Sequence, residues 1–172
     1  LFLVWLAIKI EPYRLERLTT FLNPGANSLG SGYHIQNALI AIGSGGLWGL
    51  GFGQSRQKYL YLPESHTDSI FAIIGEELGL IRAAIIVVLF AFVTIRGYRI
   101  AKNAPDTFSR LIATGITTWF FSQMFINIGA MLSIIPLTGV PLPFISSGGS
   151  SLVILLSAVG ILVNISKSQR RV

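Results

Sequence analysis

Three long apolar stretches dominate the pattern of this chain. They cover residues 70–96, 111–135 and 151–166, and each approaches the roughly 20 apolar residues that a helix needs to cross a bilayer. A shorter apolar stretch, 1–11, opens the chain without a Met, a basic region or a small-residue cleavage site. It therefore does not resemble a signal peptide. We expect it to be the end of a further membrane helix, and the chain to be the C-terminal part of a longer protein.

The connection over residues 12–69 is much longer than the few residues that usually join two helices. It is rich in apolar and aromatic side chains, so we expect it to fold back onto the membrane surface. Within it, residues 33–42 carry apolar residues at helical spacing, with His34, Gln36 and Asn37 on the other side, which predicts a short interfacial helix. The fold class that follows is an all-α polytopic membrane protein with short interfacial helices in one long loop.

The composition fits this class, because 52% of the residues are hydrophobic and only 12% are charged, against about a quarter in soluble domains. Lys and Arg collect in residues 97–110 and 167–172, which places both segments in the cytoplasm, and 12–69 and 136–150 outside. The net charge of +6 is thus a topology signal and does not indicate a nucleic-acid partner. No Cys is present, which excludes disulfides and thiolate metal sites.

A glycine-rich run, GSGGLWGLGFG, occupies residues 43–53. Such a run can cradle a phosphate with main-chain N–H groups, or it can allow tight turns and close main-chain packing. No nucleotide-binding motif surrounds it, so packing is the favoured interpretation. Arg56 and Lys58 follow directly, and an anionic group near them stays reasonable.

The strongest candidate for chemistry is Asp68, at the start of the helix predicted over 70–96. A short oxygen-bearing side chain there can simply cap the helix, and this alternative explains Asp68 equally well. In favour of chemistry, Glu64, His66 and Asp68 lie within five residues, at a membrane interface that can hold a carboxylate as a base. Ionisable groups inside a span usually face a bundle interior or a wet cavity, so Glu76 and Glu77 indicate a cavity.

Two further segments carry polar groups at membrane depth. Gln123 and Asn127 lie one turn apart on the predicted helix 111–135, and hydrogen bonds between helices explain them better than substrate contact. The segment 136–150 contains three prolines and a Ser- and Gly-rich run. Irregular main chain at this depth must be buried or line water, so we expect this segment to form another wall of the same cavity.

Two long motifs in this order resemble the SEDS family (shape, elongation, division and sporulation), represented by FtsW, RodA and SpoVE. They are GYHIQNALIAIGSGGLWGLGFGQSRQKYLYLPESHTDSIFAIIGEELG, which is similar to the family's large outer loop and next helix, and PLTGVPLPFISSGGSS, preceded by Asn127. The resemblance covers nearly the whole chain and is nearer to the FtsW and SpoVE branch. It departs from the common wording at Ser69, Arg82 and Ser133, and we expect Arg82 to pair with Glu76 or Glu77.

The resemblance implies the last four helices of a ten-helix enzyme of the bacterial plasma membrane. That enzyme is a peptidoglycan glycosyltransferase, which polymerises lipid II on the extracytoplasmic side. The family's essential loop aspartate corresponds to Asp68, the general base for an inverting transfer. Substrate contacts are expected from Glu64, His66, Arg56, Lys58, Ser147 and Gly148.

Further expectations concern charge and partners. Arg56 and Lys58 are candidates to stabilise the leaving diphosphate, with a divalent cation, Mg²⁺ or Mn²⁺, as a competitor; no metal ligand is assigned. The expected partners are a class B penicillin-binding protein, divisome proteins and membrane lipid. Two alternatives stay open, namely a lipid II flippase and a non-catalytic scaffold for a penicillin-binding protein.

Overall fold

A computed structural model describes residues 17, 19–22, 31–55, 57 and 67–168, and this part of the chain contains helices and loops but no strand. The long helices are α3 (Ser31–Gly45), α5 (Ile70–Lys102), α6 (Thr107–Met131) and α7 (Gly149–Ser168). The predicted all-α class is confirmed. The apolar stretch predicted over 1–11 lies outside the described residues.

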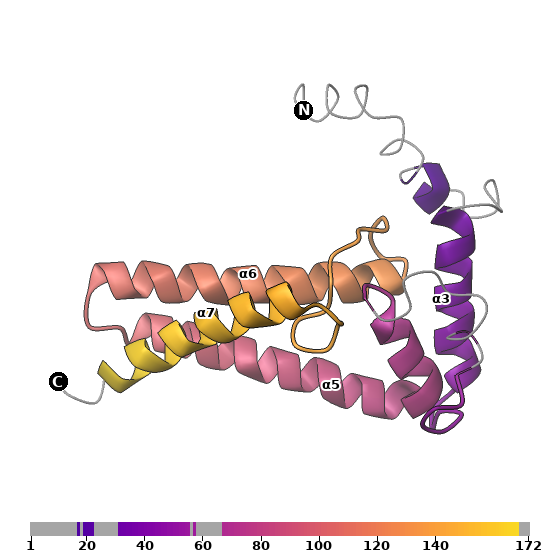
Figure 1. The fold of residues 1–172 in the computed structure, drawn as a ribbon, viewed down its shortest axis with the longest axis horizontal. Coiled ribbons are helices and arrows are strands. Elements are labelled where there is room, and N and C mark those ends of the chain that lie inside the picture. Colours follow the sequence, from indigo (N-terminus) through magenta and orange to yellow (C-terminus); the bar gives the residue numbers. More distant parts are fainter. Residues whose placement is uncertain (1–16, 18, 23–30, 56, 58–66, 169–172) are drawn as a thin grey trace.

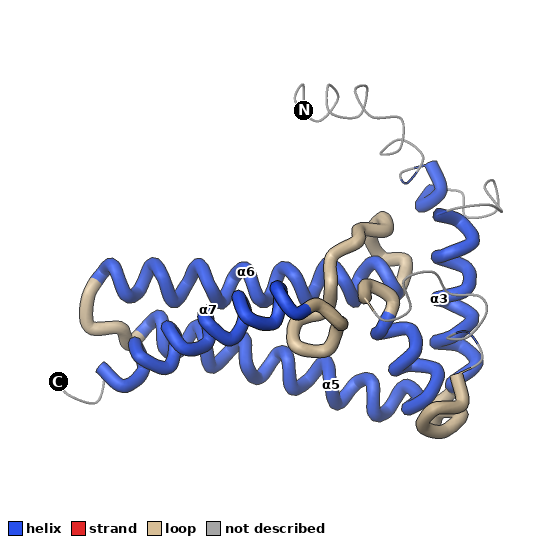
Figure 2. The backbone as a smooth tube through the Cα atoms, viewed as in Figure 1, coloured by secondary structure: helices blue, strands red, loops and turns tan. Residues whose placement is uncertain are grey.

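Three of these helices, α5, α6 and α7, are long and apolar enough to cross a membrane. Figure 1 shows α5 and α6 lying side by side, with α7 crossing them and α3 running across one end of the bundle. The described loop residues that follow α3 and the loop that follows α6 gather at this same end (Figure 2). We call it the Asp68 end, because α5 begins there.

α5 begins at Ile70 as predicted, and the other limits lie a few residues away from the predicted spans 70–96, 111–135 and 151–166. At the start of α6, Asp106 acts as N-cap, and its carboxylate accepts a 2.8 Å hydrogen bond from the main-chain N–H of Ser109. At its other end Ser133 has a positive φ of 55°, a left-handed conformation that a helix cannot continue through. Local capping and turn geometry therefore set these limits, rather than hydropathy.

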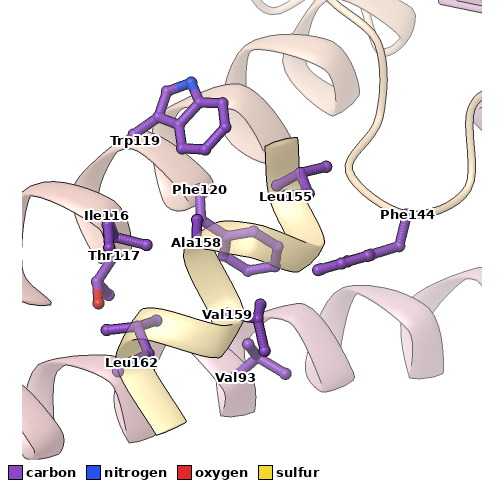
Figure 3. Close-up of a pocket in the computed structure, with 11 residues that line it drawn as sticks. Val93, Ile116, Thr117, Trp119, Phe120, Phe144, Leu155, Ala158, Val159 and Leu162 are labelled. Atoms are coloured by element: carbon purple, nitrogen blue, oxygen red, sulfur yellow. The ribbon is translucent and has the colours of Figure 1, made fainter. Parts of the chain in front are cut away.

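Aromatic rings join the loop after α6 to the bundle. The Phe120 ring on α6 lies 5.8 Å, centroid to centroid, from Phe90 on α5 and 5.8 Å from Phe144 in the loop. Figure 3 shows Phe144 pointing towards Phe120, with Leu155 and Ala158 of α7 close to the same rings. A small cavity of about 30 Å³ lies where α7 crosses α5 and α6, and a larger hollow of about 270 Å³ lies between α5, α6 and the loop beside Phe120 and Phe144.

α5 is two helical segments joined at Gly79, which has φ 78° and ψ 172°. The first segment, 70–78, runs alongside α3, and the second, 80–102, runs alongside α6 (Figure 1). A straight helix of 33 residues would be about 50 Å long, well beyond a hydrocarbon core of about 30 Å. The break leaves a second segment of about 35 Å, which matches one span.

α3 confirms the helix predicted over 33–42, but the faces differ from the prediction. His34 and Asn37 are 8% and 7% exposed and share the buried face with Ile35, whereas Leu39 and Ile40 are exposed. His34, Gln36 and Asn37 were expected on the side opposite the apolar residues, but only Gln36 is exposed. His34 and Asn37 are buried because this face of α3 packs on the first segment of α5, where Ser69 Oγ lies 2.8 Å from His34 Nε2.

Candidate functional site

The glycine-rich segment, here residues 45–53, replaces the hydrogen bonds that α5 loses at its break. The N–H groups of Leu50 and Gly51 donate to the carbonyls of Glu76 and Glu77, both at 3.0 Å. In return, the carbonyl of Gly46 accepts from the N–H of Leu80 at 2.9 Å. A broken helix at membrane depth needs such replacement partners, because lipid offers none.

This contact requires main chain to approach main chain without intervening side chains. A Cβ atom on Gly79 would overlap the main chain of Leu47, Trp48 and Gly49, and one on Gly49 would overlap the carbonyl of Glu77. Close packing, the favoured interpretation of the glycine-rich segment, is therefore confirmed. The phosphate alternative loses its support at Leu50 and Gly51, because both N–H groups donate to protein carbonyls.

The two acids on the first segment of α5 face the protein interior, as expected. Glu76 is 1% exposed, and its Oε2 accepts a 2.5 Å hydrogen bond from the Ser55 hydroxyl. Glu77 is 6% exposed and lines a pocket of about 240 Å³ together with Phe52 and Ile145. The segment 70–78 thus carries its charges inwards, towards the glycine-rich segment and the loop after α6.

The expected ion pair between Arg82 and Glu76 or Glu77 is wrong. Arg82 is exposed, and its Nη1 donates a 3.3 Å hydrogen bond to the main-chain oxygen of Trp48. Arg82 follows the break in α5, so it lies at the outside of the corner while the two glutamates lie inside. The guanidinium therefore supports the turn of the chain, and the Glu76 carboxylate is bonded by Ser55 instead.

Asp68 does not cap α5. The N-cap is Ser69, and no side chain caps the first turn of this helix. The partly buried Asp68 carboxylate lies instead between two hydroxyl groups, with Oδ1 at 3.3 Å from Thr67 Oγ1 and 3.5 Å from Ser69 Oγ. Ser69 Oγ is in turn 2.8 Å from His34 Nε2 on α3. The alternative that explained Asp68 by capping alone is therefore wrong.

The main chain around Asp68 is held from α6 and from the loop that follows α6. Asn127 Nδ2 donates to the carbonyl of Asp68 and to that of Val140, both at 2.7 Å. Ser146 Oγ donates to the carbonyl of Thr67 and accepts a 2.7 Å hydrogen bond from the N–H of Leu142. The Asp68 segment, α6 and the loop are thus tied together at one point.

The loop after α6 contributes the neighbouring wall, as expected of the segment 136–150. A Cβ atom added to Gly139 would lie 3.7 Å from Asp68 Oδ2, so the main chain of this loop runs beside the carboxylate. Gln123 Nε2 donates to the carbonyl of Pro141 at 3.0 Å. Gln123 and Asn127 therefore bond to loop carbonyls, and the expected hydrogen bonds between helices are wrong for both.

The described residues cover only part of the predicted site. Arg56, Lys58, Glu64 and His66 lie outside them. Ser147 and Gly148 are exposed at the start of α7, and it is their neighbour Ser146 that contacts the Asp68 segment.

Sequence reasoning assigned no role at the site to His34, Ser69, Asn127 or Ser146. His34 and Ser69 are polar residues beside apolar stretches, while Asn127 and Ser146 also belong to the second family motif and Ser146 to the predicted wall segment 136–150. These signals show that a partner is needed, but not which one.

A divalent cation has no ready site in this part of the chain. No group of three or more His, Cys, Asp or Glu side chains that could hold a metal ion exists among the described residues. Near Asp68, the hydroxyls of Thr67 and Ser69 donate to its carboxylate, while Asn127 and Ser146 donate to main-chain carbonyls. The described residues therefore do not fit a metal centre, and Asp68 is considered below through its own carboxylate.

The chain has close relatives in sequence. It is 52% identical over 159 residues to stage V sporulation protein E of Bacillus subtilis, covering 92% of this chain and 43% of the relative. It is 50% identical over 153 residues to the probable peptidoglycan glycosyltransferase FtsW of the same organism, covering 89% of this chain and 38% of the relative. The chain spans less than half the length of these curated relatives.

Solved structures share the fold. A chain from a structure titled as the coordination of polymerization and crosslinking by a peptidoglycan synthase complex matches with a TM-score of 0.73. Its sequence is 25% identical, and the match covers 97% of this chain and 46% of that chain. A variant of the rod shape determining protein RodA of Thermus thermophilus matches with a TM-score of 0.59 at 30% identity, covering 77% of this chain and 40% of that chain.

A sequence model described as a cell cycle protein family, FtsW/RodA/SpoVE, matches residues 1–171. With the three apolar helices, this match makes the chain part of a multi-pass membrane protein. The relatives in sequence and in structure agree with it. The chain belongs to the FtsW, RodA and SpoVE family of cell cycle proteins.

Proposed function

We propose that the full-length protein containing this chain is a peptidoglycan glycosyltransferase that polymerises lipid II, with Asp68 as its general base. The observation that carries the proposal is the setting of Asp68. It is a carboxylate that caps no helix and forms no ion pair with the described residues, while its main chain is fixed from α6 and the following loop. Relatives named as probable peptidoglycan glycosyltransferases support the reaction class.

In the proposed reaction, Asp68 takes the proton from the acceptor sugar hydroxyl. The resulting oxygen nucleophile attacks the anomeric carbon of the donor, whose bond to the lipid diphosphate breaks. The diphosphate leaves with the electron pair, and an α-linked donor becomes a β-1,4-linked product. One displacement inverts the anomeric carbon, so a single carboxylate is sufficient and no second one is needed as nucleophile.

We propose that this site lies on the extracytoplasmic side of the bacterial plasma membrane. The reason is that Lys and Arg concentrate where α5 and α6 are connected, at the end of both helices that is far from Asp68. Arg96, Arg99 and Lys102 lie in the last turns of α5, and Arg110 lies in the first turn of α6. Membrane-bound lipid II would reach Asp68 from that outer side. We further propose Arg56 and Lys58 as the charges near the leaving diphosphate, with substrate contacts from Glu64, His66, Ser147 and Gly148.

A class B penicillin-binding protein is the proposed partner, with divisome proteins as further partners. A solved relative of this fold belongs to a peptidoglycan synthase complex, which supports such an assembly. Pairing would place strand polymerisation beside cross-linking. The functional test below therefore uses the full-length protein together with this partner.

The test is polymerisation of purified lipid II by the wild type and by Asp68→Asn. General-base catalysis contributes about 10²- to 10⁴-fold, so we expect Asp68→Asn to lower kcat by that factor. Asp106→Asn is the matched control, because it makes the same substitution at the other end of the bundle and Asn caps helices as well as Asp. Asp106→Asn should polymerise at the wild-type rate.

The same variants separate the alternatives. Asp68→Asn that polymerises at the wild-type rate would remove Asp68 as the base. A wild type that makes no glycan but moves a labelled lipid II analogue across vesicles would indicate the flippase. A wild type that does neither, yet stimulates its partner's transpeptidation, would indicate the scaffold.

A further inference from the structure

We propose that Asn127 and Ser146 are positioning residues, which fix the direction of the Asp68 side chain by holding the main-chain carbonyls of Thr67 and Asp68, one on each side of the Asp68 Cα. This inference rests on the proposed function, because it concerns how the base is aimed. Neither residue contacts the Asp68 carboxylate among the described contacts. They act on the main chain that carries it.

Asn127 is placed to do this by its burial and its two donors. Its side chain is 1% exposed, and both of its bonds end on carbonyl oxygens, Asp68 O and Val140 O. Only the amide NH₂ group can serve two acceptors, so the orientation of the side chain is fixed by its partners. None of the described residues donates to its buried Oδ1. Among the described residues, Asn127 therefore acts on the site through its two donated hydrogen bonds, to Asp68 O and Val140 O.

Ser146 holds the adjacent carbonyl from another element. Its hydroxyl donates to Thr67 O and accepts from the N–H of Leu142, so both functions of the hydroxyl are used. The carbonyls of two consecutive residues are then fixed, one from α6 and one from the loop. A peptide segment held at two successive points cannot rotate about its own axis. The Asp68 side chain therefore leaves the main chain in one direction.

Other contacts keep the loop in place without Asn127. Gln123 bonds to Pro141 O, and the Phe144 ring packs against Phe120. Asn127 is the residue that also reaches Asp68. The Gln123 side chain donates to the loop but not to the main chain of Asp68. It therefore provides a matched comparison one helical turn away on the same face of α6.

The experiment measures lipid II polymerisation by the full-length protein with its penicillin-binding partner for three isosteric amide-to-acid variants. Asn127→Asp removes both donors to Asp68 O and Val140 O, Gln123→Glu removes only a donor to the loop, and Asn164→Asp changes an exposed residue of α7. A misplaced catalytic group costs about 100-fold in rate. We expect Asn127→Asp to lose about that factor in kcat with KM unchanged, Gln123→Glu to lose less than tenfold, and Asn164→Asp to match the wild type.

Ser146 gives an independent arm that does not introduce a charge. Ser146→Ala should lower kcat at unchanged KM, and Ser146→Thr, which keeps the hydroxyl, should restore it. A purely structural role would instead lower the folded fraction and the binding of the partner. Both quantities are therefore measured for every variant by size-exclusion chromatography of the complex.

The outcomes separate this inference from the proposed function. If Asp68→Asn is inactive while Asn127→Asp and Ser146→Ala keep the wild-type kcat, the positioning role is wrong and the function stands. Equal losses in Gln123→Glu and Asn127→Asp, or variants of both residues that fail to assemble, would make them structural and also overturn it. Full polymerisation by Asp68→Asn would overturn both proposals together.

Discussion

The two segments of α5 are both rich in apolar residues but have opposite surroundings. In the first, 70–78, no residue is exposed, and it carries both buried glutamates. In the second, 80–102, large apolar residues such as Val88 and Phe92 are exposed at 65% and 59%. The first segment is held by main-chain bonds to the glycine-rich segment. The second lies along α6 and leaves large apolar side chains exposed.

This difference shows that hydropathy alone does not distinguish a membrane span from an apolar helix that builds a site. Both segments are apolar, but only the second has a bilayer-sized length and an exposed apolar face. The first is defined by what it contacts, namely α3, the glycine-rich segment and, through Asp68, the end of α6. Substitutions should therefore lower stability strongly at the break around Gly79 and only slightly along the membrane-spanning helices.

The largest effect should come from the corner itself. Gly79→Ala places a Cβ atom against the main chain of the glycine-rich segment and at a positive φ. We expect a loss of roughly 3 kcal/mol or more in stability, seen as a lower melting temperature of the full-length protein in detergent and as lost polymerisation.

Gly160→Ala on α7 is the matched control. No atom lies within 4 Å of the added Cβ there, and Ala favours a helix over Gly by up to about 1 kcal/mol. We expect unchanged or slightly raised stability. If both variants behaved alike, the corner would not depend on the close approach of the two main chains.

A smaller effect is expected where the buried Glu76 meets Ser55, two residues after the glycine-rich segment. Ser55→Ala removes the hydroxyl that donates to Glu76 Oε2 at 2.5 Å, leaving a buried carboxylate with one donor fewer. Such a loss costs about 1–3 kcal/mol. The melting temperature should fall by less than for Gly79→Ala.

The control for this variant is Ser157→Ala, since this exposed hydroxyl bonds only to Val153 O in its own helix. Its effect should stay within about 0.5 kcal/mol. Adding Glu76→Gln tests the contact itself. The losses from Ser55→Ala and Glu76→Gln should not add if the two side chains share one interaction.

The smallest effect should appear at the far end of the span, where the polar group is exposed and its partner is local. The main-chain N–H of Ser109 holds the pKa of the Asp106 carboxyl below its usual value. Because the pKa is lowered in the folded state, the ionised carboxylate stabilises the start of α6 at pH values above the ordinary pKa of about 3.9. This stabilisation is lost as the pH falls through the lower, folded value.

Hydrogen exchange of the first amides of α6 measures this effect. Protection relative to the intrinsic exchange rate should fall in that acidic range for the wild type. In Asp106→Asn it should stay constant, because the amide caps the helix without titrating. A wild type whose protection did not change with pH would contradict the cap.

The sequence was sufficient for the parts of the fold that depend on local properties. The three spans follow from apolar length, and the helix around α3 follows from the spacing of its apolar residues. The break at Gly79 could not be predicted, because a glycine in the run IIGEELG is compatible with a continuous helix. Its bend depends on residues 46–51, which lie some thirty positions earlier in the chain.

The site was predictable to the same degree. Asp68 was identified from a family motif and from nearby acids, whereas the roles of Asn127 and Ser146 depend on partners far away in sequence. Asn127 contacts a carbonyl 59 residues before it, and Ser146 one that is 79 residues before it. A polar residue in an apolar stretch signals that it needs a partner, but only the fold identifies that partner. The same limit led to the wrong buried face for α3.

The exchange of main-chain hydrogen bonds at Gly79 also bears on biosynthesis. The glycine-rich segment precedes α5 in the chain, so it leaves the ribosome before the half-helix that it will hold. When residues 80–102 enter the membrane, Leu50 and Gly51 have already been synthesised. Their N–H groups can then bond to the carbonyls of Glu76 and Glu77. The break at Gly79 therefore does not depend on a segment that is translated after it.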